Sequence, residues 1–186
     1  PFGPAMRERL CSAWTVTLHY QTLTALSNAL RRFGLSDSAS GFEAMAAKVL
    51  VVHSYHAEYD WCQGIDGAIN KILGPAGIEH RVFYMDTKRK SSKEWKEESG
   101  RAAEKEMLAY NPDVVITVDD DAQEFFTKKN MSNEKIQFVF CGVNGELEKY
   151  GYPAKNVTGI LERTYADQSI KIINQIVPGI KKAALV

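Results

Sequence analysis

The architecture is predicted most directly by the stretch Lys48-Val-Leu-Val-Val-His-Ser-Tyr-His-Ala-Glu-Tyr-Asp-Trp61. Its first six residues form a short, nearly continuous apolar run, which is typical of a strand buried on both faces of a parallel sheet. The remaining residues are polar and aromatic, which predicts a loop at the carboxyl end of that strand. A pattern of apolar residues at helical spacing follows at about 60–73, and Gly74-Pro75 marks its end. Strand, loop and helix in this order make the first unit of an α/β fold.

The same alternation continues along the chain. We expect further strands at 79–85, 114–118, 136–141 and 157–160, and further helices at 91–110, 122–129 and 165–177. This alternation predicts a parallel sheet with helices on both faces, connected by right-handed crossovers. The predicted fold is therefore a doubly wound parallel sheet of about five strands in the order 2-1-3-4-5. In the helix at 91–110, the residues expected to face the sheet are Trp95, Ala102, Ala103, Met107 and Leu108.

Composition excludes several classes of protein. The 186 residues include 23 Lys and Arg against 23 Asp and Glu, so the chain lacks the basic excess of a nucleic-acid binder. A hydrophobic fraction of 45% and a charged fraction of 25% are ordinary for a folded globular protein and argue against disorder. No apolar run approaches the length that spans a bilayer, so no direct membrane span is predicted. The three cysteines, Cys11, Cys62 and Cys141, form no zinc-binding pair and indicate no disulfide framework.

Residues 1–46 differ from the rest and are predicted to be an N-terminal extension: a leader, a tag or an added helix. Apolar residues recur at helical spacing in 16–33, and Gly34 is a suitable helix stop. Ala44-Met-Ala46 partly resembles an export cleavage site, although no clean hydrophobic segment precedes it. An exported leader and an amphipathic helix packed on the domain both remain open.

The other end of the chain suggests an unfinished strand. The run that starts at Lys182 begins like a buried strand and stops at Val186. We therefore expect the natural protein to continue beyond Val186. The predicted boundaries are an extension at 1–46, an α/β unit at 47–160, and a segment at 161–186 that holds a connecting helix and the first residues of a further strand.

Ligands of open α/β sheets bind outside the carboxyl ends of the strands. That rule selects four loops: 53–61, 86–87, 119–121 and 141–144. The first is unusual, because aromatic rings with polar edges alternate there with charged and hydroxyl side chains. The residues predicted to contact a ligand are His53, Ser54, Tyr55, Tyr59, Trp61, Asp119, Asp120 and Asn144.

A catalytic interpretation has less support. His53 and His56 with an aspartate at 119–121 could form a base or a metal site, but two histidines three residues apart on a loop are weak support. The dinucleotide fingerprint GxGxxG and the hydrolase and metalloprotease motifs are absent. The alternative function is a flavodoxin-like cytosolic enzyme or regulatory domain that uses Asp119–Asp121 and His53. We predict no enzyme activity and no cofactor.

Several segments in order resemble one family of proteins. The segment 49–56, followed by Trp61 and Gly64-Ile-Asp-Gly67, resembles the opening of the substrate-binding proteins of ABC transporters, in the branch that includes aromatic amino-acid-binding and sensor-kinase-associated members. Later strands of that family are similar to 111–118, 138–143 and 156–160, and its crossover into a second lobe is similar to 178–186. The resemblance covers roughly 47–186.

The resemblance implies one lobe of a type I periplasmic-binding-protein fold. The implied organisation is solute-binding lobe one at 47–160, followed at 161–186 by the hinge, the crossover helix and the truncated start of lobe two. Such proteins hold a small solute between two lobes that close by hinge motion. The implied location is periplasmic or extracytoplasmic, and the implied partners are a small-molecule solute and either an ABC-transporter permease or a sensor kinase. The residues implied for the hinge are Thr158, Gly159, Glu162 and Arg163.

Roles can be assigned to the predicted contact residues on this basis. The solute would be a small organic molecule, with an aromatic amino acid or a related carboxylate as the candidate. Ser54 and Asn144 would bond its polar head, and Asp119 or Asp120 would pair with an ammonium group. The rings expected to stack on its apolar body are Tyr55, Tyr59 and Trp61.

Overall fold

The structure is a computed structural model that describes residues 48–163, 165–179, 181 and 182. The predictions for the extension at 1–46 and for the strand beginning at Lys182 therefore lie outside the described residues. Within them, no helix is long and apolar enough to cross a membrane.

Five parallel strands form one sheet in the order β2-β1-β3-β4-β5, which confirms the predicted fold class. The strands are β1 (Val49–His53), β2 (His80–Tyr84), β3 (Val114–Val118), β4 (Gln137–Val143) and β5 (Val157–Leu161). Val51 of β1 aligns with Val82 of β2 on one side and with Ile116 of β3 on the other. Every residue of β1 and β3 is buried, as their continuous apolar sequences predict. The sheet therefore places all five carboxyl ends along one edge.

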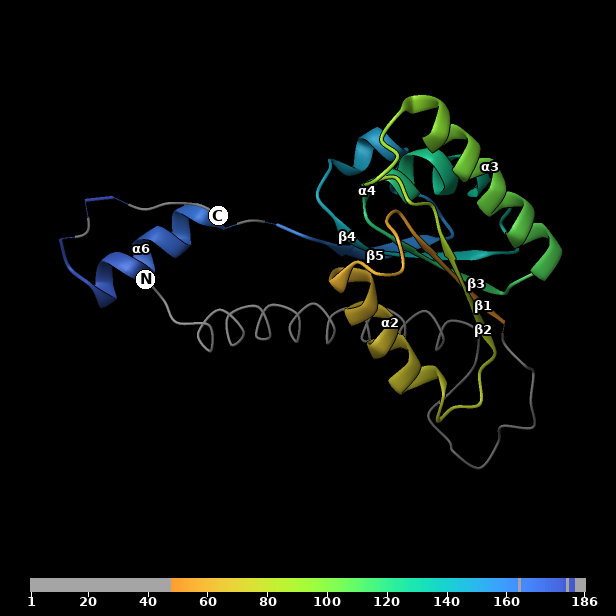
Figure 1. The fold of residues 1–186 in the computed structure, drawn as a ribbon, viewed down its shortest axis with the longest axis horizontal. Coiled ribbons are helices and arrows are strands. Elements are labelled where there is room, and N and C mark those ends of the chain that lie inside the picture. The colour runs from red at the N-terminus through yellow and green to blue at the C-terminus, as the bar shows by residue number, and fades with distance from the viewer. Residues whose placement is uncertain (1–47, 164, 180, 183–186) are drawn as a thin grey trace.

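Helices cover the two faces of the sheet unequally (Figure 1). Helix α2 (Asp60–Leu73) packs on one face. The other face is covered by α3 (Lys93–Tyr110) and by a helical stretch made of α4 (Asp120–Ala122), the π-helix η1 (Gln123–Thr127) and α5 (Lys128–Asn130). The remaining helical elements are the 3₁₀-helix η2 (Leu147–Tyr150) and α6 (Ala166–Ile176).

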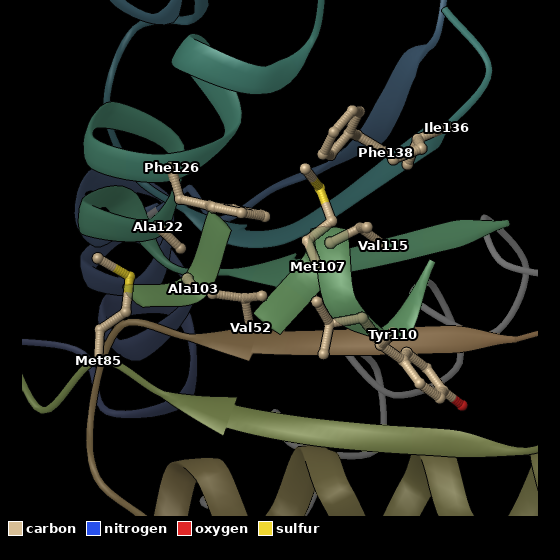
Figure 2. Close-up of a cluster of buried hydrophobic side chains, with 11 residues drawn as sticks. Val52, Met85, Ala103, Met107, Tyr110, Val115, Ala122, Phe126, Ile136 and Phe138 are labelled. Atoms are coloured by element: carbon tan, nitrogen blue, oxygen red, sulfur yellow. The ribbon is translucent and has the colours of Figure 1, made fainter. Parts of the chain in front are cut away.

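The core beneath α3 contains apolar side chains from strands and helices (Figure 2). Ala103 and Met107 of α3 are buried there, as the sequence predicts. The prediction for Leu108 is wrong, because its side chain is 65% exposed. Successive helix residues are rotated by about 100°, so with Met107 directed at the sheet the next residue turns toward solvent.

One glycine sets how closely α3 approaches its neighbour. A Cβ added to Gly100 would lie 2.3 Å from the carbonyl oxygen of Phe125 in η1. That atom belongs to the backbone, so a side-chain rotation cannot relieve the clash. Gly100 therefore permits the packing of α3 against η1 that closes this face of the sheet.

We predict that Gly100→Ala lowers the free energy of unfolding by about 1–3 kcal/mol, because the added methyl overpacks this contact. The matched control is Gly67→Ala in α2, where an added Cβ meets no atom within 4 Å. It should be neutral or stabilise the protein by about 0.5–1 kcal/mol, since alanine is the better helix former. Thermal denaturation of both variants checks the pair. Equal melting temperatures would contradict this account of the α3–η1 contact.

Helix α6 differs from the other helices. All its residues from Asp167 to Ile176 are exposed, and Figure 1 shows the helix lying away from the sheet. Of the seven large hydrophobic residues exposed in the described chain, six lie in or beside this helix: Tyr165, Ile170, Ile172, Ile173, Ile176 and Val177. Its apolar residues are thus unpartnered among the described residues.

Candidate functional site

Hydrogen bonds join the loops at the carboxyl edge of the sheet. The Ser54 amide, after β1, donates to the Val118 carbonyl of β3 (3.1 Å), and the Thr87 amide, after β2, donates to the Ser54 carbonyl (2.9 Å). The Asp119 amide donates to Cys141 of β4 (2.9 Å), and the Glu162 amide donates to Val143 (2.8 Å). We call the loops joined in this way the carboxyl edge: 54–61, 86–89, 119–121, 142–145 and 162–163.

Asp119 has the least favourable backbone at this edge. Its φ of 74° and ψ of 171° fall in a region that is nearly restricted to glycine, and such strain persists where the surroundings enforce it. Its carboxylate is held, because Oδ1 accepts hydrogen bonds from the Tyr55 hydroxyl (2.8 Å) and the Asp120 amide (2.8 Å). Strain of this kind concentrates at functional sites.

Burial also shifts the pKa of the Asp119 carboxyl group, because the residue is only 8% exposed. Loss of hydration raises its pKa to about 6, against the lowering effect of its two hydrogen bonds, and the negative charges of Asp120 and Asp121 act in the same direction as burial. A carboxylate that is ionised at neutral pH in such surroundings favours any positively charged partner that can reach it.

A second positive-φ aspartate follows β2. Asp86, with a φ of 56°, accepts hydrogen bonds from Arg89 Nε (2.7 Å) and Nη2 (3.1 Å). His56 Nδ1 lies 3.7 Å from Asp86 Oδ1. The hydrogen bonds and charge of Arg89 lower the pKa of Asp86, so this carboxylate, unlike Asp119, already has a cation beside it.

Two of the predicted aromatic rings lie together. Tyr55 and Tyr59 meet edge to face with their centroids 5.4 Å apart, and both are half-buried. Lys88 Nζ lies 3.8 Å from the centroid of Tyr59 and donates to its hydroxyl (2.6 Å). The sequence analysis selected the loop 86–87 after β2 but assigned no ligand contact to it and did not single out Lys88. Its position two residues beyond Asp86 was the signal that could have found it.

Trp61 belongs partly to the core. Its ring packs against the cluster between α2 and the sheet, which includes Ile65 and Val118. The ring also meets the end of β4: Cζ2 is 3.3 Å from the position that a Cβ on Gly142 would occupy. Gly142 has a φ of 68°, so glycine suits both the backbone conformation and the space.

His53 and Ser54 are occupied inside the fold. His53 is fully buried, stacks on Tyr84 at 5.2 Å and pairs through Nε2 with Asp66 of α2 (2.8 Å). The Ser54 hydroxyl donates to the Val118 carbonyl (2.8 Å) and accepts from the Ala122 amide (2.8 Å). These bonds join β1 to its neighbours, but His53 Nδ1 has no hydrogen-bond partner among the described residues. The ligand contacts predicted for both residues stay predictions.

Asp120 and Asn144 differ in how fully their polar atoms are already hydrogen-bonded. Asp120 Oδ1 accepts from the Gly145 amide (2.9 Å) and the Tyr150 hydroxyl (2.6 Å), so this carboxylate holds the β4 loop. Asn144 is exposed, and its Nδ2 lies 3.4 Å from Glu162 Oε2. Both oxygens of Asp120 thus accept hydrogen bonds, since the Asn144 amide donates to Oδ2 (3.3 Å), whereas Asp119 accepts only through Oδ1 among the described residues but is the more buried of the two.

The predicted hinge residues divide into two pairs. Thr158 and Gly159 lie within β5, where Gly159 fits closely against Phe140. Glu162 and Arg163 follow that strand at the carboxyl edge, and Arg163 Nη1 donates to the Asn144 carbonyl (2.5 Å). The hinge role of all four stays a prediction.

No protein-family model matches the chain, and no curated protein or solved structure was found to be similar to it. In the part of the chain that the structure describes, no group of three or more His, Cys, Asp or Glu residues could hold a metal ion. The argument for a binding site at the carboxyl edge therefore uses the contacts and distances of its residues alone.

We predict that Asp119→Asn stabilises the protein at pH 8 by on the order of 2 kcal/mol, with the gain vanishing near pH 4. Asp119 has a folded pKa of about 6 against an ordinary value of 3.8. Between those values the folded state binds more protons than the unfolded state, so this group's contribution to stability falls as pH rises. Asparagine is isosteric and removes the charge. Denaturant titrations of both proteins across this range measure the difference.

The matched control is Glu148→Gln, an exposed carboxylate whose replacement should leave stability nearly unchanged at either pH. A variant Asp119→Asn that is no more stable than the original protein at pH 8 would contradict the electrostatic account of Asp119.

Proposed function

We propose that this chain is a non-enzymatic solute-binding lobe whose carboxyl edge contacts a small organic molecule. The observation that carries the proposal is the contact between Tyr55 and Asp119. It joins an aromatic pair after β1 to a strained, buried carboxylate after β3, at the edge where open α/β sheets bind ligands. The aromatic rings can pack against an apolar part of the ligand, and the carboxylate can bind a positively charged group of the ligand.

The proposal includes the wider assignment implied by the family resemblance. The lobe would belong to an extracytoplasmic binding protein that delivers its solute to an ABC-transporter permease or reports it to a sensor kinase. The candidate solute remains an aromatic amino acid or a related carboxylate. In this proposal a second lobe covers the apolar residues of α6, whose exposure supports a further packing surface.

The flavodoxin-like alternative receives no support from the geometry. Its two elements were His53 and Asp119–Asp121. The His53 ring is directed at α2 and pairs with Asp66, whereas Asp119 pairs with Tyr55, and no hydrogen bond described here joins His53 to any of the three aspartates. A base and its acid partner need hydrogen-bond reach of each other.

Tyr59→Ala tests the aromatic pair. Tyr59 is half-buried at the edge, so we expect the truncation to change the free energy of unfolding by only about 1 kcal/mol. If its ring contacts the ligand, affinity for L-phenylalanine or L-tryptophan should fall about tenfold, equivalent to ~1.4 kcal/mol. Affinities come from ligand-observed NMR, which detects the weak binding expected of a single lobe, and stability comes from thermal denaturation.

Tyr165→Ala is the matched control, because Tyr165 is 60% exposed beside α6 and belongs to none of the carboxyl-edge loops. It should leave the affinity unchanged. The proposal is contradicted if Tyr59→Ala binds both amino acids as the original protein does, or if neither amino acid nor any related amine or carboxylate binds at the edge.

A further inference from the structure

A buried side-chain amide bonds to the strained aspartate of the carboxyl edge. Gln123, the first residue of η1, is fully buried, and its Nε2 donates to the Asp119 carbonyl (3.0 Å). The backbone amide of Gln123 donates instead to the Asp120 carbonyl. The side chain of Gln123 therefore holds a backbone group of the candidate site in addition to its place in the interior.

Both backbone polar groups of Asp119 are hydrogen-bonded. Its amide donates to the Cys141 carbonyl (2.9 Å), and its carbonyl accepts from Gln123. The amide and the carbonyl lie on either side of the Cα atom, so these two bonds together restrain φ and ψ. A backbone conformation as rare as that of Asp119 persists only where the surroundings enforce it. The bond from Gln123 is therefore one of the contacts that enforce it.

The side-chain amide of Gln123 can be oriented in only one way. A carbonyl oxygen only accepts hydrogen bonds, so the NH₂ end must face the Asp119 carbonyl. The Oε1 end accepts from two hydroxyl groups, those of Thr117 in β3 (3.1 Å) and of Tyr152 (2.9 Å). Both of these residues are buried, so every hydrogen bond of this amide lies inside the protein. Such a fully bonded interior network fixes the orientation of its members.

The helical stretch is irregular at the same place. Gln123–Thr127 form a π-helix between α4 and α5, and π-helical turns are frequent at functional sites. The Thr127 hydroxyl donates to the Ala122 carbonyl (3.3 Å), so a side chain supports the widened turn. The departure from regular helix thus begins at the residue that bonds to Asp119. It is an observation independent of the hydrogen bonds that Gln123 makes.

The peptide group between Asp119 and Asp120 connects Gln123 to the carboxylate. Its carbonyl accepts from Gln123, and its N–H group, the Asp120 amide, donates to Asp119 Oδ1 (2.8 Å). A peptide group is planar, so it rotates as one unit when ψ of Asp119 changes. Rotation would break both bonds together and free the carboxylate from one of its two donors, leaving the Tyr55 hydroxyl. Gln123 therefore acts on the Asp119 carboxylate without touching it.

We propose that Gln123 is a positioning residue of the candidate binding site, because it holds the peptide group between Asp119 and Asp120 and so fixes where the Asp119 carboxylate meets the ligand. This inference rests on the proposed function and deepens it. It makes binding depend on a buried residue outside the carboxyl-edge loops. Thr117 and Tyr152 contribute by fixing the amide of Gln123.

Two substitutions in one helical stretch test the inference. Gln123→Met removes the amide and keeps an unbranched side chain of similar length. The matched control is Asn130→Leu, because Asn130 is a buried amide in α5 that donates to the Phe126 carbonyl (2.9 Å), a bond that involves no residue of the carboxyl edge. Both variants should have lower melting temperatures, since each leaves a buried carbonyl without a donor.

The Asp120 amide proton separates the two variants. A hydrogen bond to an ionised carboxylate is shorter and stronger than one to the neutral acid, so this amide signal should shift as the Asp119 carboxyl group titrates. The ¹⁵N-labelled 186-residue chain is followed between about pH 4 and pH 8. Gln123→Met should reduce the pH-dependent shift by about half or more, because the peptide group can then rotate, and Asn130→Leu should leave it unchanged.

Binding is measured on the same proteins by ligand-observed NMR with L-phenylalanine. Gln123→Met should weaken it about tenfold, and Asn130→Leu should leave it unchanged. Tyr152→Phe provides a milder second variant, since it removes one hydroxyl bonded to Gln123 and keeps the ring. It should reduce both the amide shift and the affinity in the same direction, and it decides the matter if Gln123→Met does not fold.

The outcomes separate this inference from the function on which it rests. An unchanged Asp120 shift in Gln123→Met and Tyr152→Phe would overturn the positioning role, as would an equal loss in Asn130→Leu, which would indicate general loosening. A reduced shift with unchanged affinity would also overturn it and leave the solute-binding proposal standing. If the original protein binds neither L-phenylalanine nor L-tryptophan, the proposed function fails and the role of Gln123 in binding fails with it.

Discussion

The parallel pairing of β1 with both neighbours is the constraint on which the rest of the structure depends. Val49–His53 is buried on both faces and bonded to β2 and β3, so its chain must leave the sheet at the edge where those strands also end. Ser54 then fixes the exit by bonding to the Val118 carbonyl and the Ala122 amide. The position of Tyr55 and its bond to Asp119 follow from this attachment. The candidate site is thus a consequence of strand order.

The edge combines groups that a fold optimised for stability alone would avoid. Asp119 has a glycine-like backbone and a buried charge that forms no ion pair with a described residue, and Trp61 has an enclosed indole nitrogen with no hydrogen-bond partner in the described part of the chain. Binding sites tolerate such groups because a ligand completes them, at a cost in the free energy of folding. Hydrogen bonds around these groups limit the loss of folding stability. Asp120 accepts hydrogen bonds that hold the loop after β4, and Tyr55 donates one that fixes the Asp119 carboxylate. The strained residue Asp119 is therefore held in place by its neighbours.

The sheet could be predicted from sequence because its signal is local. Continuous apolar runs such as Val114–Val118 identify buried parallel strands, and the alternation with helices leads to the observed order. The contacts of individual side chains were harder to predict, because the sequence of a loop does not show which distant residues its side chains will bond to. The sequence predicted His53 and Ser54 as ligand contacts, which stays a prediction, but it could not show that they bond to Asp66 and Ala122. Leu108 was misplaced for a similar reason, since periodicity alone cannot fix the rotation of α3 to within one residue.

The claim that the carboxyl edge is a binding site is tested most directly by a crystallographic screen with a chemically mixed set of small amines, zwitterions, carboxylates and neutral molecules. The account predicts that bound molecules gather beside Tyr55, Tyr59 and Asp119, and that those with a positively charged nitrogen dominate. Molecules that gather at the amino ends of the strands or along α6, with the carboxyl edge left empty, would contradict it.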